Sequence, residues 1–325
     1  MTEALGFLRG RSYLFALLLT IALFIANVIA QPHFANPDNW PQQLATLAPV
    51  MLVALASTPA ILSGGGGIDI SVGPLAVLCN VLLVHTLLPH GIDSAWANVA
   101  ILAAFGLAVG TINGLLVAVL RYEPVIATLC MFFVINGINL KVGATPKAAG
   151  SNWTTSLADQ VGPVPGAVLV IGAAVVIWLL LGRTAYHRAL YAVGGNDATA
   201  FSAGVNVAAT RVIAYAIGGV FAAFAGIALT ALVQASEAGA SASYALVGIT
   251  AVALGGTPLY GGRGGMVGSA LGAIVLYLIQ TFLGALSVAP EWLPVVYGGM
   301  LLLGVVVGSR AAAPRIATRQ TAATA

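Results

Sequence analysis

The chain has 325 residues, of which 60% are apolar and only 6% are charged, and its formal net charge is +3. A soluble domain carries charge on roughly a quarter of its residues, so this composition excludes an ordinary soluble enzyme, a disordered chain and a nucleic-acid-binding protein. With a mean hydropathy of +1.01, the sequence predicts an all-α protein that crosses a lipid bilayer many times.

Uncharged apolar windows divide the chain into about ten predicted transmembrane segments. Each window is about long enough for one helix across a ~30 Å hydrocarbon core. In chain order the windows are 12–37, 39–68, 70–92, 94–120, 124–140, 160–182, 212–236, 238–262, 264–290 and 292–309. Several of these helices should be short or broken by glycine. The first window is long for the core of a signal peptide, so we expect it to remain as a helix.

The positions of the basic residues predict the orientation. An even number of spans places both termini on one side, and the side richer in Lys and Arg faces the cytoplasm. With cytoplasmic termini, all basic residues except Lys141 and Lys147 lie inside. We expect residues 1–310 to form a single transmembrane domain and residues 311–325 to form a cytoplasmic tail without fixed structure.

One long loop, about residues 183–211, is predicted on the cytoplasmic side. Its stretch Asp197–Ala203 favours a short helix, with Asn196 or Asp197 placed to cap it. Most such loops are solvated connectors. Three aromatic residues add apolar surface that a connector does not need, and they favour a docking surface for a partner protein: Tyr186, Tyr191 and Phe201.

Glycine is distributed in patterns that predict helix breaks and close helix packing. Leu62–Leu78 and Leu254–Val275 each place a glycine-rich break between two apolar segments, which suggests two loosely related halves. Small residues at four-residue spacing let helix backbones approach closely in lipid. That spacing occurs twice, at Gly106, Gly110 and Gly114, and at Gly264, Gly268 and Gly272.

Asp69 is the one acidic residue with long apolar flanks on both sides. An ionisable group at membrane depth is costly and usually faces a protein interior or an aqueous cavity. Asp69 and Ser71 are therefore predicted to line a translocation route or its inner gate, or to cap a helix that starts near Val72. Asn113, Asn136 and Asn139 are polar mid-helix residues that could bind hydroxyl groups of a cargo molecule. They could equally hydrogen-bond between helices, which is the favoured role for any one of them.

The sequence offers no motif for several other chemistries. It has no GxxxxGK[ST] loop, so the chain does not bind ATP by that route. We assign no catalytic residues, metal ligands or cofactor, because no His, Cys or acidic cluster has the required spacing. A proton relay would need more than one buried carboxylate, and Asp69 stands alone.

Four motifs in order resemble a known family. They are GGIDISVG (Gly66–Gly73), NGLLVAVLRYEPVIATL (Asn113–Leu129), YAVGGNDATAFSAGVNV (Tyr191–Val207) and AVALGGTPLYGGRG (Ala251–Gly264). Together they resemble the permease subunits of bacterial ABC sugar importers of the ribose, xylose and galactofuranose type. The resemblance covers the chain from about residue 45 to residue 308.

The resemblance implies a multi-pass protein of the bacterial inner membrane that forms the pathway for a sugar. Its partners would be ATP-binding cassette subunits that hydrolyse ATP, a periplasmic sugar-binding protein and a second permease subunit, identical or not. The third motif would couple the permease to a cassette. The coupling residues expected from it are Tyr191, Gly194, Gly195, Asn196, Asp197, Ala200 and Gly204.

One departure from the family pattern keeps alternatives open. Ala245 and Val247 stand where the family usually carries acidic residues, which would fit a different substrate or a non-identical second permease that supplies them. A permease of the branched-chain amino-acid type is the nearest alternative. A stand-alone secondary transporter is a further one, although Asp69 alone is thin support for an ion site.

Overall fold

The computed structural model describes residues 13–312, and this part of the chain is almost entirely helical. The α-helices are α2 (Leu14–Ala30), α3 (Trp40–Leu62), α4 (Val72–Leu82), α5 (Ala95–Ala118), α6 (Pro124–Val142), α7 (Thr154–Ala158), α8 (Gly166–Gly182), α9 (Ala185–Gly195), α10 (Asp197–Ser202), α11 (Val207–Val233), α12 (Ser241–Leu254), α13 (Met266–Ala285) and α14 (Leu293–Ala312). Short turns of other helix types are η1 (Pro37–Asn39), η2 (Leu83–Leu87), η3 (Leu88–His90), η4 (Ala238–Ala240) and η5 (Pro290–Trp292). A two-stranded hairpin joins β1 (Gln160–Val161) to β2 (Val164–Pro165).

Within residues 13–312, six helices are long and apolar enough to cross a membrane by themselves. They are Pro37–Leu62, Val72–His90, Ala95–Ala118, Pro124–Val142, Val207–Val233 and Met266–Ala285. The helices α8 and α9 pass the same test when they are taken together, but the chain bends by 85° between them. The pair therefore counts as at most one span. The all-helical, multi-span class predicted from composition is therefore confirmed, with six or seven clear spans. Only Ala311 and Ala312 of the predicted tail are described, at the end of α14, and the rest of that tail lies outside the described residues.

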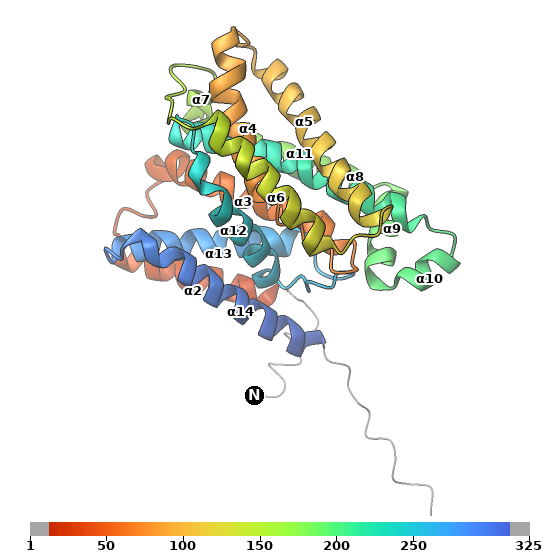
Figure 1. Cartoon of the computed structure of the whole chain (residues 1–325). Helices are drawn as coiled ribbons and strands as arrows, with labels where there is room; N and C mark the ends of the chain where they lie inside the picture. The colour runs from red at the N-terminus through yellow and green to blue at the C-terminus, as the bar shows by residue number, and fades with distance from the viewer. Residues whose placement is uncertain (1–12, 313–325) are drawn as a thin grey trace, which may run out of the picture.

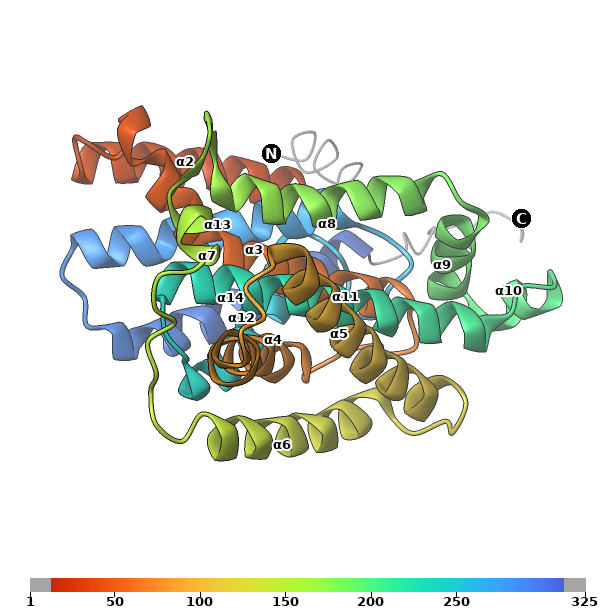
Figure 2. The same cartoon turned by 90° about the horizontal axis from the view of Figure 1, so that it is seen from above.

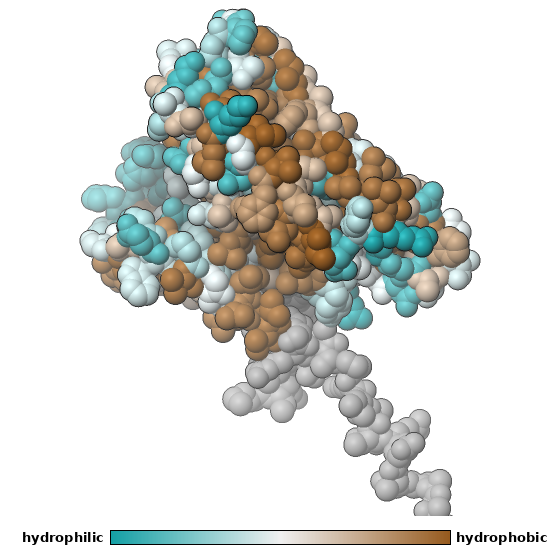
Figure 3. Space-filling model, viewed as in Figure 1, coloured by the Kyte–Doolittle hydropathy of each residue, from teal (hydrophilic) through white to brown (hydrophobic). Residues whose placement is uncertain are grey.

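The surface of the bundle has an apolar middle and polar ends. In Figure 3, apolar side chains cover the face over α5 and α6, whereas polar side chains gather near α10 and near α7. Ile126 and Phe133 of α6 are 61% and 64% exposed, a degree that water disfavours and lipid accepts. An apolar waist between two polar ends matches a helical protein whose middle is surrounded by hydrocarbon.

Helix α11 forms the centre of the bundle and packs against α3, α4 and α5 (Figures 1 and 2). The face of α5 that meets α11 is made of Gly106, Gly110 and Gly114. A Cβ atom at Gly106 or Gly110 would collide with the backbone of α11. These glycines let two helix backbones touch, which supplies packing where lipid offers no hydrophobic driving force.

A second seam joins α12 to α13. Added Cβ atoms at Gly268 and Gly272 would collide with the backbones of Gly255 and Ala251. Gly264, expected on the same helix face, instead lies in the loop before α13 with a φ of +90°. Glycine is needed there for its backbone conformation, because side chains rarely tolerate this φ.

The two glycine-rich breaks, residues 63–71 and 255–265, lie together at one end of the bundle. The backbone N–H of Gly262 donates to the carbonyl of Leu62 at 3.2 Å. Gly64, Gly65 and Gly66 all have φ values between +62° and +74°, a region that favours glycine. Each break carries a single charged residue, Asp69 in the first and Arg263 in the second, and is otherwise uncharged. The uncharged windows therefore run into the breaks and overestimate the lengths of the flanking helices.

We predict that Gly110→Ala destabilises the protein by about 1–3 kcal/mol, because its methyl group must push α5 away from α11. Gly172→Ala in α8 is the matched control, since nothing lies within 4 Å of the atom it adds. The control should be neutral or stabilising by up to about 1 kcal/mol through helix propensity. Thermal unfolding in detergent measures both, and equal unfolding temperatures would contradict the role of this seam.

Candidate functional site

A buried polar cluster lies where the first break joins α4. One oxygen of Asp69 (Oδ1) accepts from the backbone N–H of Ser71 at 2.9 Å and from the Ser71 hydroxyl at 2.7 Å. The Asn113 amide on α5 donates to the Ser71 hydroxyl oxygen at 2.7 Å and to the second Asp69 oxygen (Oδ2) at 3.4 Å. Asp69 is 4% exposed, and the other two side chains are fully buried. The three residues therefore tie the break to α4 and α5.

The cluster differs from a simple helix cap. Ser71 is the residue before α4, but neither its side chain nor that of Asp69 bonds the first free N–H groups inside that helix. Asp69 instead closes a turn with Ser71, the residue two positions later. The prediction that the side chain of Asp69 or Ser71 caps the helix beginning at Val72 is therefore wrong.

Two polar atoms beside the cluster have no hydrogen-bond partner among the described residues. They are the Asn113 side-chain oxygen and the hydroxyl of Tyr215 on α11, both fully buried. The Tyr215 hydroxyl lies within electrostatic range of Asp69. Burying a polar group without a hydrogen-bond partner costs free energy. Another conformation of this end of the bundle could give these two atoms partners.

The structure separates Asn136 from the cluster. Asn136 is half-buried on α6, and its side chain makes no hydrogen bond within residues 13–312. Asn139 on the same helix is fully buried. Asn139 donates to the carbonyl of Pro74 at 3.0 Å and to the Ser241 hydroxyl at 3.3 Å. Asn139 thus joins α6 to α4 and α12. This is the bond between helices that the sequence favours for a mid-helix asparagine.

The segment from α9 to α10 lies across one end of the bundle (Figure 2). Its second helix begins at Asp197 as predicted and ends at Ser202, one residue before the predicted end. The Asn196 side chain accepts from the N–H of Thr199 at 2.9 Å, so Asn196, rather than Asp197, is the cap. Gly204 ends the turn after α10 with a φ of +81°.

Glycines join this segment to both breaks. A Cβ atom at Gly194 would collide with the carbonyl of Leu62 and contact the backbone of Gly262 at 2.7 Å, while Gly195 has open space. The Tyr191 hydroxyl donates to the carbonyl of Gly264 at 3.0 Å. Burial raises the pKa of Tyr191, so the hydroxyl keeps the proton that it donates. We call this meeting of Gly64, Gly194 and Gly262 the glycine junction.

The structure corrects the expected orientation of α10. Ala200, expected to face a partner protein, is only 4% exposed and faces its own chain. Phe201 is 74% exposed and is the residue that projects from this end. The rotation of a six-residue helix cannot be deduced from its small residues alone, because small side chains also pack against the helix's own neighbours.

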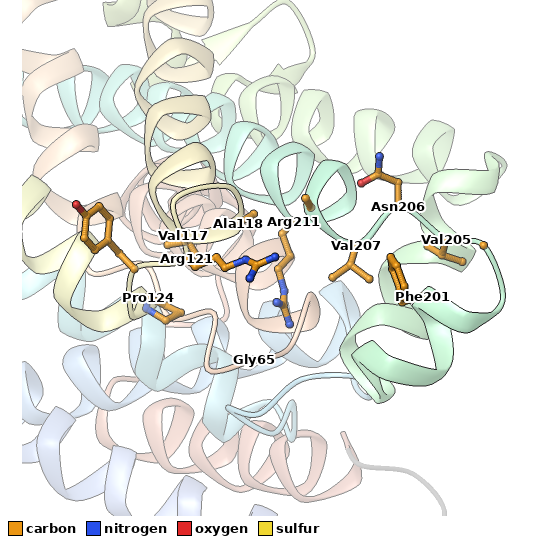
Figure 4. Close-up of a pocket in the computed structure, with 13 residues that line it drawn as sticks. Gly65, Val117, Ala118, Arg121, Pro124, Phe201, Val205, Asn206, Val207 and Arg211 are labelled. Atoms are coloured by element: carbon orange, nitrogen blue, oxygen red, sulfur yellow. The ribbon is translucent and has the colours of Figure 1, made fainter.

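A groove of about 770 Å³ opens beside α10. Arg121 and Tyr122 from the turn between α5 and α6 form one wall, and Phe201 and Val205 form another (Figure 4). The guanidinium groups of Arg121 and Arg211 both turn into it. Arg211 and Tyr215 are functional candidates that the sequence analysis missed. Arg211 could have been found as the single charged residue near the start of the apolar helix α11.

Within the part of the chain that the structure describes, no three His, Cys, Asp or Glu side chains come close enough together to hold a metal ion. The two cysteines are not paired with each other.

Known proteins resemble this chain over nearly its whole length. Residues 42–305 match the family model of the permease component of branched-chain amino acid transport systems. The ribose import permeases of Bacillus subtilis and Escherichia coli are 34% and 31% identical to it, covering 90% and 94% of this chain and 92% and 95% of their own lengths. The fructose import permease of Rhizobium meliloti is 30% identical, covering 90% of this chain and 83% of its own length. No solved structure matches the chain.

Apolar spans, an apolar waist and polar segments gathered at the ends define a multi-pass membrane protein. The chain belongs to the family of permease components of branched-chain amino acid transport systems, and the resemblance to ABC sugar-import permeases identified from its four motifs is confirmed.

We predict that Asp69→Leu destabilises the protein by about 2–4 kcal/mol, because it leaves the Ser71 N–H and the Ser71 hydroxyl proton without an acceptor in a buried site. Asp69→Asn should stay within about 1 kcal/mol, since its oxygen still accepts from Ser71 and its amide can pair with the Asn113 oxygen. Asp93→Leu, at an exposed turn, is the control. Thermal unfolding of the three variants in detergent tests this, and a Leu variant as stable as the wild type would contradict it.

Proposed function

We propose that this chain is the membrane subunit of an ATP-binding cassette importer that takes up a sugar or a related polyol across a bacterial inner membrane. The observation that carries the proposal is the near full-length similarity to permeases named for ribose and fructose import. The ATP-hydrolysing cassettes and a periplasmic sugar-binding protein are separate subunits in this proposal.

We propose ten membrane crossings. Besides the six clear spans and α8, three apolar helices are slightly short, namely Leu14–Ala30, Ala238–Leu254 and Pro290–Val306. The 17 residues of the first span about 26 Å at 1.5 Å per residue, close to the hydrocarbon thickness. Each of the three packs against a neighbour in the bundle rather than forming a separate lobe.

The distribution of charge over the two ends supports cytoplasmic termini. Arg121 and Arg211 line one groove, and Arg263 lies in the break that α9 contacts. At the opposite end, the backbone N–H of Lys147 donates to Ser236 and that of Glu237 donates to Asn80. The arginine-rich end is therefore assigned to the cytoplasm by the positive-inside rule.

The segment from α9 to α10 is the proposed docking surface for a cassette. It lies at the arginine-rich end, presents Phe201 to solvent and reaches both breaks through the glycine junction. Exposed aromatic residues are enriched among the side chains that contribute most to binding between proteins. Tyr191, Gly194, Asn196 and Asp197 then act by shaping this segment rather than by touching the cassette.

We place the translocation pathway between two permease subunits. Asp69, Ser71 and Asn113 are closed off from solvent, so in this conformation they hold the inner break rather than contact cargo. Ala245 and Val247 are also buried, 5% and 4% exposed, which leaves no room for acidic side chains facing water. The proposed role of the Asp69 cluster is an inner gate that the cassettes move.

Deletion of the gene, followed by uptake measurements with labelled ribose, fructose, galactose and leucine, tests the function. The proposal expects loss of uptake of a sugar with leucine uptake unchanged. The family description keeps a branched-chain amino-acid permease as the second candidate, and selective loss of leucine uptake would establish that candidate instead.

We predict that Thr199→Cys is labelled from the cytoplasm and Ser151→Cys from outside. Both side chains are exposed, and the ten-span arrangement places them on opposite sides. Cys79 and Cys130 are first replaced, and an impermeant maleimide is applied to spheroplasts and to inverted vesicles. Labelling of both positions from one side would contradict the ten-span topology.

We predict that Phe201→Ala weakens cassette binding. Loss of an aromatic residue at the centre of an interface typically costs about 2 kcal/mol or more, which corresponds to a dissociation constant roughly 30-fold larger. Trp96→Ala is the matched control. Trp96 is also an exposed aromatic residue, 84% exposed, but it lies at the start of α5, away from the groove beside α10. Copurification of the cassette from detergent measures the effect, and equal recovery with both variants would contradict the docking surface.

A further inference from the structure

Arg211, the fifth residue of α11, joins the docking segment to the first glycine-rich break. Its Nη2 atom contacts Asp197 Oδ2 at 2.6 Å, which is the one ion pair among the described side chains. Its Nε–H points to the carbonyl of Ser63 at 3.5 Å. Arg211 is 17% exposed and Asp197 49% exposed, so the pair spans the boundary between solvent and interior.

The break is shaped around this guanidinium group. A Cβ atom at Gly65 would fall on the Nη2 atom of Arg211, and the φ of +62° at Gly65 also favours glycine. The planar guanidinium carries several N–H groups in fixed directions, so it can hold Asp197 with one and Ser63 with another. A lysine ammonium could not hold both contacts in the same geometry.

The same face of α11 continues to the Asp69 cluster. Tyr215 follows Arg211 by four residues, one helix turn, and therefore lies next to it along α11. Its hydroxyl is within electrostatic range of both Asp69 and Arg211. The path along the chain is also short, because Ser63 and Asp69 are the two ends of one loop. Two routes, one along α11 and one along the break, thus connect Asp197 to Asp69.

We propose that the ion pair between Arg211 and Asp197 transmits movement of the docked α10 helix to the first break, so that ATP binding by the cassettes moves the inner gate. This inference rests on the proposed docking of a cassette on α9 and α10. Arg211 is a positioning residue, since it touches neither cargo nor ATP. An ion pair so close to water contributes little to stability, so its removal should separate coupling from folding.

The test uses the complete transporter in proteoliposomes with its cassettes and binding protein. Arg211→Gln, Asp197→Asn and the double variant should retain the cassettes and their basal ATPase activity. In each variant, loaded binding protein should stimulate the ATPase about tenfold less than in the wild type, and transport should be about tenfold slower. An effect of this size is in the usual range of coupling between sites. Because the two residues act as one link, the double variant should lose no more than the single variants.

Arg183→Gln is the matched control, since it removes an exposed positive charge at the end of α8, outside the docking segment, and should change stimulation by less than about twofold. Wild-type stimulation in Asp197→Asn, whose side chain is half exposed and whose folding is not at risk, would overturn the proposal. Losses that multiply in the double variant, or loss of the cassettes themselves, would also overturn it. The docking proposal fails by a different result, namely full recovery of the cassette with Phe201→Ala.

Discussion

Close approach of helix backbones is the constraint on which this structure depends. Lipid is as apolar as the helix surfaces, so helices in a bilayer are held by packing and hydrogen bonds rather than by the hydrophobic effect. In this chain the contact surfaces are made of glycine, as along the seam of α5 with α11 and at Gly226, where a Cβ atom would collide with the carbonyl of Ala76 on α4. The central position of α11 follows from these contacts, because only a helix with small neighbours can be approached on several faces.

The same rule explains the glycine-rich breaks. Irregular backbone within a membrane protein needs partners for its polar groups, and it finds them only where protein covers it. The first break bonds the second through Leu62 and Gly262, the Asp69 cluster satisfies its far end, and Arg211 covers its middle. A junction of backbone against backbone has little slack, so a displacement of α9 must move both breaks or separate them. This property suits an element that turns binding of a partner into a change of the membrane segments.

Family membership and this geometry support one proposal from different directions. The relatives named for sugar import cover nearly all of the chain, and the structure places an exposed aromatic residue, Phe201, on a segment that contacts both breaks. The buried, unpaired atoms of Asn113 and Tyr215 add a reason for a second conformation, since a rearranged inner gate could give them partners. The unpaired atoms lie next to the Asp69 cluster, at the point where the proposed link from Arg211 ends.

The sequence by itself determined the membrane class, the approximate spans, the two breaks and the start of α10 at Asp197, because hydropathy, glycine and capping residues act locally along the chain. Only the tertiary structure decided that Ala200 faces inward, that Asn139 rather than Asn136 is buried, and that Gly264 lies in a loop. It also decided the contact of Arg211 with Ser63, residues separated by 148 positions. Such contacts depend on how each helix is rotated about its axis and on which helices become neighbours, and in a chain that is apolar on every side hydropathy cannot specify that rotation.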